Sequence, residues 1–172
     1  APSFANAIAT ALPIPLSPPV IKATFPFPID KADQLLVFCN QQKKSISEIV
    51  YENELSLRTP EEIDHELMRI WNTMLECMYI GCHTEGTLPG GLNVRRRAYD
   101  THEKLKGDLP YNTPQEWLQT IRKTKVYFRQ ILKWVSCFAL AVNEVNASLG
   151  RVVTAPTNGS AGVIPAVLMY YL

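Results

Sequence analysis

An apolar stripe near the middle of the chain is the feature that most restricts its fold. Thr59, Pro60 and Glu62 precede the stripe in the capping-box arrangement that starts helices. Intervals of 4, 3, 1, 3, 1 and 3 residues place the stripe on one helical face, and its members are Ile63, Leu67, Ile70, Trp71, Met74, Leu75 and Met78. We predict a long helix that begins at Pro60 and is ended by Gly81.

Similar start and stop signals predict further helices between residues 30 and 150. Residues 134–142 are apolar on all sides, so we expect other helices to surround them. Asp30 is expected to cap a helix over residues 31–40, with Leu35, Leu36 and Phe38 inward. Ser45 or Ser47 is expected to cap a short helix that runs through Tyr51 to Leu57. Further helices are expected over residues 94–106 and, as one long helix or a helix pair, from Thr113 to Leu149, where Gly150 ends it.

Sustained strand alternation is missing from the sequence, and only residues 151–154 can extend briefly. The last residues, 167–172, are apolar and lie inside an expected helix that has no cap. We therefore predict an all-α fold: a compact domain of about six helices over residues 30–172, incomplete at its C-terminus.

The first 29 residues are dominated by proline, with seven of the thirteen prolines and Lys22 as their one charge. Proline prevents a regular helix and favours extended backbone. The same segment carries many apolar side chains that would otherwise face water. We expect residues 1–29 to lie along a partner surface as a connection between domains.

Composition excludes several classes of partner. A formal net charge of +1 generates no field that would attract nucleic acid or an anionic membrane, and the longest apolar run is too short to span a bilayer. We read the one basic cluster, residues 95–97, as a solvated helix start. Four cysteines do not make a disulfide framework, so a reducing, cytoplasmic location is predicted.

The cysteines offer little support for a metal site. Cys77 and Cys82 have a C-x4-C spacing, but on a continuous helix their side chains point roughly 140° apart. A ligand set would need more cysteines nearby, and the others are Cys39 and Cys137. We predict buried, inert cysteines and no metal ligand in this chain.

A glycine-rich loop follows Gly81 and holds the first candidate catalytic residues. His83 and Glu85 can transfer protons, and Thr84 between them can donate a hydrogen bond. A solvated turn explains the same residues equally well. His65 and His102 are expected to be exposed.

The strongest candidate site lies between residues 143 and 162. A helix start has free N–H groups and a partial positive charge, so it suits a small carboxylate or phosphate. Asn143 closes the preceding apolar helix, and Gly159 and Gly162 allow close backbone approach. The residues expected to line the pocket are Thr157, Asn158, Gly159 and Ser160. A helix end followed by an ordinary capped turn is the structural alternative.

Three segments resemble the bacterial iron–sulfur-dependent L-serine dehydratases. The closest similarity lies in H-T-E-G-T-L-P-G-G-L within residues 79–98 and in V-T-A-P-T-N-G-S-A-G within residues 138–172. A weaker similarity lies in S-I-S-E-I-V-Y-E-N-E-L, residues 45–55. Together these segments cover nearly the whole chain after residue 29.

The resemblance implies a helical α domain, joined in single-chain members to an amino-terminal α+β domain. It implies a lyase of serine catabolism and gluconeogenesis that converts L-serine to 2-aminoacrylate and then to pyruvate and ammonia. A [4Fe-4S] cluster would act as Lewis acid on the departing hydroxyl. None of the four cysteines here matches the family's cluster ligands, so we expect them outside this chain and expect the fragment to be inactive alone.

The same resemblance assigns site residues as expectations. Thr157, Asn158, Gly159 and Ser160 would accept the serine carboxylate, with Thr84 and Asn143 as neighbours. His83 and Glu85 would be the catalytic candidates. A homodimer is compatible with the sequence but is not established by it.

Two alternatives remain at this point. One is a non-enzymatic helical interaction domain whose N-terminal arm docks on a partner. The other is a pyridoxal-phosphate dehydratase, which needs a Schiff-base lysine and a glycine-rich phosphate loop on an α/β scaffold. The helical pattern and the lack of lysine within residues 143–162 disfavour the second.

Overall fold

The computed structural model describes residues 25–108 and 110–171, and it divides into two compact units, Ala1–Asp64 and His65–Leu172. Within the described residues there are seven α-helices and no strand, which confirms the predicted all-α class. No helix of this described part is long and apolar enough to cross a membrane. The prediction of an extended arm falls mainly on residues 1–24 and lies outside the described residues.

The first unit contains α2 (Ala32–Gln42) and α3 (Ile46–Leu55), which pack against each other. Ser45 caps α3 as predicted, in a reciprocal capping box with Glu48. The Asn53 side chain accepts the N–H of Phe27 and donates to its carbonyl, at 3.0 and 2.8 Å. These two bonds fasten the segment before α2 to α3.

Two details of α2 differ from the prediction. The helix starts at Ala32 after Lys31 rather than Asp30, because the Gln34 side chain accepts the N–H groups of both Asp30 and Lys31. The inward placement of Leu36 is wrong, since this side chain is 51% exposed, whereas Leu35 and Phe38 are half-buried. No residue of α2 is fully buried.

The long helix α4 (Pro60–His83) begins as predicted. Thr59 and Glu62 exchange reciprocal cap bonds of 2.9 and 3.3 Å. Its stripe is buried at Met74, Leu75 and Met78, but Leu67 and Ile70 are exposed. The prediction that Gly81 ends the helix is wrong, because α4 continues through Gly81 to His83.

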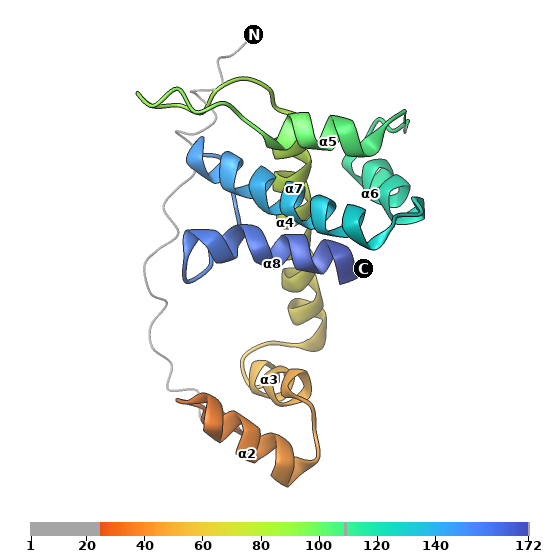
Figure 1. The fold of residues 1–172 in the computed structure, drawn as a ribbon. Helices are drawn as coiled ribbons and strands as arrows, with labels where there is room; N and C mark the ends of the chain where they lie inside the picture. Colours follow the sequence, from red (N-terminus) through yellow and green to blue (C-terminus); the bar gives the residue numbers. More distant parts are fainter. Residues whose placement is uncertain (1–24, 109, 172) are drawn as a thin grey trace. The chain divides into compact units, whose positions relative to one another are not determined.

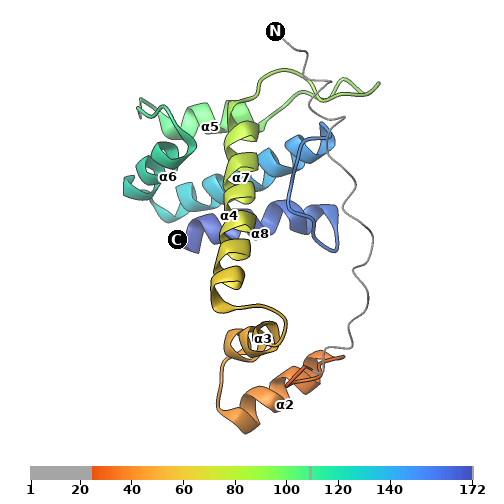
Figure 2. The same cartoon turned by 180° about the vertical axis from the view of Figure 1, so that it is seen from behind.

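The middle of the second unit is α7 (Phe128–Ala147), against which α5 (Ala98–Lys106) and α8 (Asn158–Tyr171) pack. Figures 1 and 2 show α8 running beside α7 and both crossing α4. The core is formed around α7 by Leu75, Cys77, Met78, Cys82, Ala98, Trp117, Trp134, Cys137, Phe138, Ala141, Val142, Val145, Ala166 and Met169.

Two glycines permit the close approach of these helices. A Cβ built on Gly81 would lie 2.3 Å from the carbonyl oxygen of Ala141, so α4 meets the α7 backbone directly. A Cβ on Gly162 would lie 2.7 Å from the carbonyl oxygen of Ala139 and 2.8 Å from Asn143 Oδ1. Both glycines are therefore packing positions.

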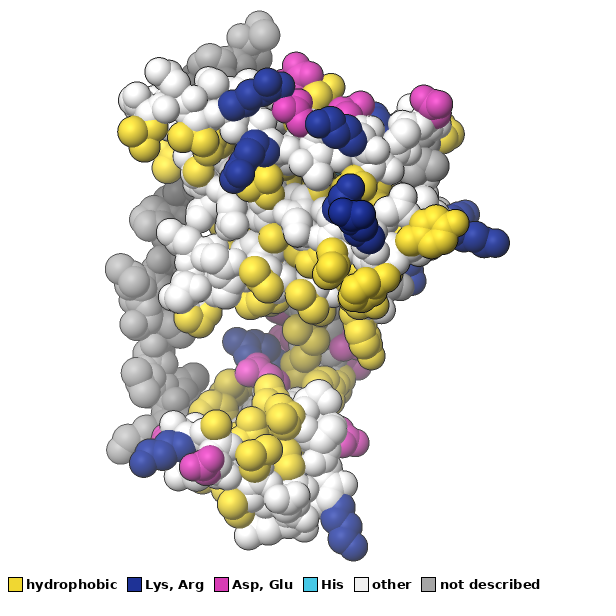
Figure 3. Space-filling model, in the orientation of Figure 1, with side chains coloured by type: hydrophobic (Ala, Val, Ile, Leu, Met, Phe, Trp, Pro, Cys, Tyr) yellow, Lys and Arg dark blue, Asp and Glu magenta, His cyan; other side chains and the backbone are white. Residues whose placement is uncertain are grey.

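The predicted burial of residues 134–142 on all sides is only partly found. Trp134, Cys137, Phe138, Ala141 and Val142 are buried, but Ser136 is exposed and the remaining positions are half-buried. The neighbouring helices α4, α5 and α8 thus cover α7 incompletely within the described residues. Figure 3 shows hydrophobic side chains exposed on the face of α8, and those with the largest exposure are Val163, Ile164, Val167, Tyr170 and Tyr171.

The segment from Thr113 to Leu149 forms the helix pair rather than one long helix. Thr113 caps α6 (Pro114–Lys123), and α7 starts only after a break. Downstream, α7 ends at Ala147, Leu149 takes a left-handed φ of 59°, and the Gly150 N–H donates to the Val145 carbonyl at 2.9 Å.

The helix predicted over residues 94–106 starts four residues later, at Ala98. Residues 86–96 instead fold back on themselves. Leu88 N–H donates to the Val94 carbonyl, and Arg96 N–H donates to the Gly86 carbonyl, both at 2.8 Å. We call residues 84–97 the hairpin loop.

Gly81→Ala and Gly162→Ala are expected to destabilise the second unit by about 1–3 kcal/mol each, because each new methyl group would overlap backbone of α7. The matched control is Gly159→Ala in α8, where a Cβ meets nothing within 4 Å. Urea unfolding followed by circular dichroism measures the difference. A neutral or stabilising effect of Gly162→Ala would contradict this account of the packing.

Candidate functional site

The predicted carboxylate site is the N-terminus of α8. Thr157 Oγ1 accepts the Ser160 N–H at 3.3 Å, and Ser160 Oγ accepts the Thr157 N–H at 3.2 Å. The two hydroxyl oxygens lie 3.0 Å apart. Thr157 and Ser160 thus form a reciprocal cap, and their side chains are occupied in starting the helix.

The free groups at this helix start belong to Asn158 and Gly159. Both residues are exposed, and within the described residues their N–H groups have no hydrogen-bond acceptor. Two such donors at a helix N-terminus are suited to a carboxylate. Because Asn158 and Gly159 are exposed, a small carboxylate in solution can reach both N–H groups.

Asn143 lies next to the same helix. It is half-buried on α7, and its Oδ1 atom approaches Gly162, which is one turn beyond Asn158 on α8. The structure therefore brings Asn143 to the first turns of α8.

His83 lies in an aromatic cluster at the end of α4. Its Nδ1 atom is 2.6 Å from the Tyr79 carbonyl oxygen, which can only accept, so Nδ1 carries the proton. Nε2 then accepts the hydroxyl proton of Tyr111 at 2.7 Å. Burial lowers the pKa of His83, and the neutral tautomer is held with both ring nitrogens occupied.

The prediction that His102 is exposed is wrong, because its side chain is 0% exposed. On α5 it follows Ala98 by four residues, and these two form the single buried face of an otherwise polar helix. Trp117 Nε1–H donates to His102 Nε2 at 3.0 Å. His65, in contrast, is exposed as predicted.

The environment of His102 keeps it neutral. Its Nδ1 has no hydrogen-bond partner within residues 25–108 and 110–171 and lies 3.5 Å from the Glu103 carboxylate. Desolvation, followed by the proximity of His83, lowers the pKa of His102 to about 4.

Thr84 and Glu85 start the hairpin loop. The Thr84 hydroxyl donates to the Ile80 carbonyl at 2.6 Å, which closes the end of α4. Glu85 is exposed, and its carboxylate raises the pKa of Tyr99. A pocket of about 320 Å³ lies between the hairpin loop and α5, and it is lined by Glu85, Gly86, Thr87, Arg95, Arg96, Tyr99 and Asp100.

The arginine cluster at residues 95–97 is not uniformly solvated. Arg95 is exposed and pairs with Asp100 at 2.8 Å. Arg96 is only 8% exposed, and its guanidinium donates to the Ser148 hydroxyl on the last turn of α7. The solvated interpretation is therefore wrong for Arg96, because its side chain anchors the hairpin loop on α7.

The predicted site residues thus fall into three places. Asn143 joins the α8 start, Glu85 lines the hairpin-loop pocket, and His83 belongs to the aromatic cluster. Within the described residues, no hydrogen bond connects the α8 start with either of the other two. Figure 1 shows that α8 starts near the end of α7, whereas α6 lies at the opposite end of α7.

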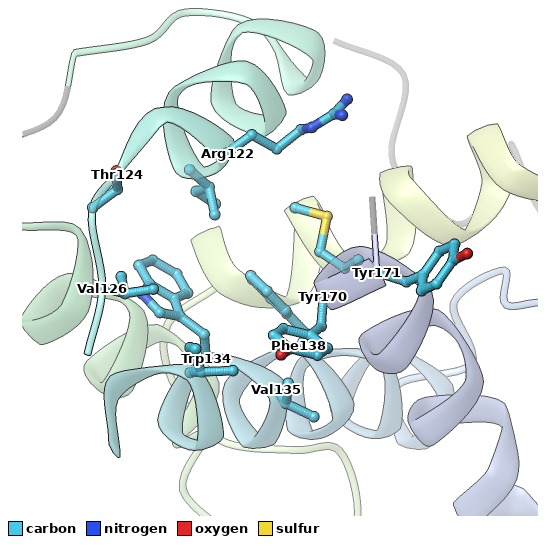
Figure 4. Close-up of a pocket in the computed structure, with 11 residues that line it drawn as sticks. Arg122, Thr124, Val126, Trp134, Val135, Phe138, Tyr170 and Tyr171 are labelled. Atoms are coloured by element: carbon cyan, nitrogen blue, oxygen red, sulfur yellow. The ribbon is translucent and has the colours of Figure 1, made fainter. Parts of the chain in front are cut away.

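A larger pocket, of about 420 Å³, contains none of the predicted site residues. Figure 4 shows that side chains from α6, α7 and α8 surround it, and most of them are apolar. Its lining is Ile121, Arg122, Thr124, Val126, Ile131, Trp134, Val135, Phe138, Met169, Tyr170 and Tyr171.

The prediction of buried thiols is confirmed for the second unit, whereas Cys39 in the first unit is only half-buried. Cys77, Cys82 and Cys137 are buried, and burial raises the pKa of Cys77 to about 11 and that of Cys82 well above its usual range. Cys82 Sγ and Cys137 Sγ are 4.0 Å apart. Among the described residues, no group of three or more potential ligands converges, so these cysteines do not fit an iron–sulfur cluster.

Sequence comparison identifies the family. The family model described as serine dehydratase alpha chain matches residues 41–172. The chain belongs to this family. Membership of the serine dehydratase alpha chain family confirms the resemblance seen in the hairpin loop and at the α8 start.

Individual relatives give the same result. L-serine dehydratase 1 of Escherichia coli strain K12 is 42% identical over 151 residues, which cover 87% of this chain and 30% of the relative. The L-serine dehydratase of Streptomyces coelicolor is 43% identical over 146 residues, 85% of this chain and 29% of that protein. This member of the serine dehydratase alpha chain family therefore spans about 30% of the length of these relatives.

One buried charged residue, Glu144, was given no site role from the sequence. Glu144 is a charged side chain that is 4% exposed, and it accepts two backbone N–H bonds from the start of α5. The available signal was a carboxylate placed between Val142 and Val145 in an apolar helix, where it requires buried partners.

The buried His102 predicts an acid-sensitive second unit. Its pKa is near 4 in the fold and about 6.5 when unfolded, so the unfolded state binds the extra proton between these values. The contribution of neutral His102 to the free energy of unfolding is therefore fully present above about pH 6.5. This contribution decreases as the pH falls toward 4, by up to about 3 kcal/mol. Urea unfolding at pH 7 and pH 4.5 measures this loss.

The matched variants are His102→Asn and His65→Asn. Replacing His102 is expected to reduce the pH dependence in this range, while the lowered pKa of His83 leaves a remainder. The His65 replacement, at an exposed position, is the control. An unaltered pH dependence in His102→Asn would contradict the assignment.

Proposed function

We propose that the intact protein is an L-serine dehydratase that eliminates water from L-serine and yields pyruvate and ammonia. The family match over residues 41–172 supports this proposal most directly. The relatives named L-serine dehydratase extend the support over 85% or more of this chain. The helical fold also lacks, within the described residues, the α/β scaffold of pyridoxal-phosphate dehydratases.

In this proposal the start of α8 binds the substrate carboxylate. The free N–H groups of Asn158 and Gly159 donate to its oxygens, and the Asn158 amide adds a directional bond. Thr157 and Ser160 act by holding the helix start in shape. Asn143, beside Gly162, and Thr84 of the hairpin loop are the proposed neighbours.

The α-proton needs a base, for which Glu85 and His83 remain the candidates. Glu85 is exposed and lines a pocket, so its carboxylate is accessible to a small molecule. His83 would first have to release the Tyr111 hydroxyl, because that proton occupies Nε2. The geometry therefore favours Glu85 as the group that accepts the proton.

The Lewis-acid chemistry expected of this family would come from a [4Fe-4S] cluster bound outside the residues described here, because the four cysteines of this chain do not fit one. Residues 1–29 are proposed as the connection to another domain, with residues 30–172 as the helical α domain. A cytoplasmic location and a homodimer stay predictions from the sequence.

Asn158→Ala in the intact protein is expected to raise KM for L-serine about tenfold with a smaller effect on kcat, because it removes one hydrogen bond to a charged carboxylate. Asn72→Ala, at an exposed position on α4, is the control. Initial rates of pyruvate formation measure both constants. Wild-type kinetics in Asn158→Ala would refute this site.

This chain by itself is expected to be inactive. After anaerobic incubation with iron and sulfide, it is expected to show no broad visible absorbance of an iron–sulfur cluster and to form no pyruvate from L-serine. The intact protein treated in the same way is the positive control. A cluster spectrum in the isolated chain would show that its cysteines can rearrange into ligands.

A further inference from the structure

The N-terminus of α5 is capped in an unusual way for this chain. Four helices carry their own cap residue: Ser45, Thr59, Thr113 and Thr157. At the corresponding position α5 has Arg97, whose side chain makes no cap bond. The cap comes instead from Glu144 on α7, a helix that follows later in the chain.

The geometry of this cap is direct. Glu144 Oε1 accepts the Arg97 N–H at 2.7 Å and the Ala98 N–H at 3.3 Å. The carboxylate faces the positive end of the α5 dipole. The other oxygen, Oε2, is buried and has no hydrogen-bond partner within the described residues. A local serine would start α5 without burying a charge, so helix capping alone does not explain this glutamate.

The same contact also holds the hairpin loop. The Arg96 N–H donates to the carbonyl of Gly86, and this hydrogen bond closes the base of the loop. Gly86 directly follows Glu85 in the sequence. The Arg96 guanidinium donates to the Ser148 hydroxyl, which in turn donates to the Glu144 carbonyl at 2.7 Å. Residues 96–98 are thus tied to the last turns of α7 through both side chain and backbone.

These contacts connect two of the candidate site groups. The hairpin loop carries Thr84 and Glu85, and α7 carries Asn143, immediately before Glu144. We propose that Glu144 is a positioning residue: its buried carboxylate fixes the hairpin loop on α7 and so sets the position of Glu85 relative to Asn143. The catalytic consequence rests on the proposed function, whereas the structural tie can be tested without activity.

Tyr99 reports the position of Glu85 directly. The carboxylate of Glu85 raises the pKa of the Tyr99 hydroxyl, with smaller influences from Glu103 and Lys106. In the intact protein, Glu85→Gln defines the full decrease of that pKa. Glu144→Ala is expected to produce most of the same decrease, because the loop is released. Glu144→Gln, which keeps an accepting oxygen, is expected to retain most of the wild-type value.

Titration of tyrosine labelled with ¹³C at Cζ measures this pKa by NMR, with Tyr99→Phe assigning the signal. Arg97→Ser combined with Glu144→Ala supplies a local cap, so that α5 stays folded while the tie to α7 is lost. This double variant is expected to show the lowered Tyr99 pKa. A wild-type Tyr99 pKa in the folded double variant would overturn the proposal.

Kinetics of the intact protein test the catalytic part. Arg97→Ser/Glu144→Ala is expected to lower kcat about 10- to 100-fold, since misplacing a catalytic group has effects of this size. In a Glu85→Gln background the same pair is expected to cost less than about twofold, because the group it positions is already lost. Equal losses in both backgrounds would refute positioning through Glu85.

The failure of the two proposals can be distinguished. A wild-type protein that forms no pyruvate from L-serine would refute the proposed function, and the Tyr99 titration would still decide whether Glu144 holds the loop. An active enzyme with an unaltered Tyr99 pKa in the double variant would refute the positioning role alone.

Discussion

The second unit depends on direct backbone contact between α7 and its neighbours. Gly81 lets α4 lie against the Ala141 carbonyl, and Gly162 lets α8 lie against Ala139 and Asn143. Any side chain at these two positions would push the helices apart and open the core. The contact with α8 also brings Asn143 beside Gly162, close to the candidate carboxylate site.

At the α8 start, capping groups and the proposed binding groups occupy adjacent positions. Thr157 and Ser160 use their hydroxyls on each other, while Asn158 and Gly159 keep their backbone donors free. A carboxylate bound there would meet a helix end that is already formed, so little ordering would accompany binding. At α5 the helix start is also capped, but the capping carboxylate belongs to Glu144 on a different helix, α7.

Local signals were sufficient to predict most of the helices. The caps at Ser45, Thr59 and Thr113 are local chemistry, and all three occur as expected. Gly81 was misinterpreted because a stop and a close helix contact require the same residue. His102 and Arg96 were misplaced because their burial depends on Trp117 and Ser148, which lie 15 and 52 residues away. At the candidate site, Asn143 lies close to α8 in the sequence and also in the structure. The hydrogen bonds of both His83 nitrogens with Tyr79 and Tyr111 depend on tertiary contacts, which local sequence patterns do not show.

The distribution of thiols has a practical consequence. Cys39 is the one cysteine of the first unit and is half-buried, whereas Cys77, Cys82 and Cys137 are buried in the second unit. Burial also raises the pKa of Cys77 and of Cys82. A thiol-reactive dye would modify Cys39 first, because this side chain is only half-buried, and would reach the other three only when α4 separates from α7. Delayed labelling of these three cysteines would therefore report unfolding of the second unit, with Cys39 as an internal reference for the reactivity of the dye.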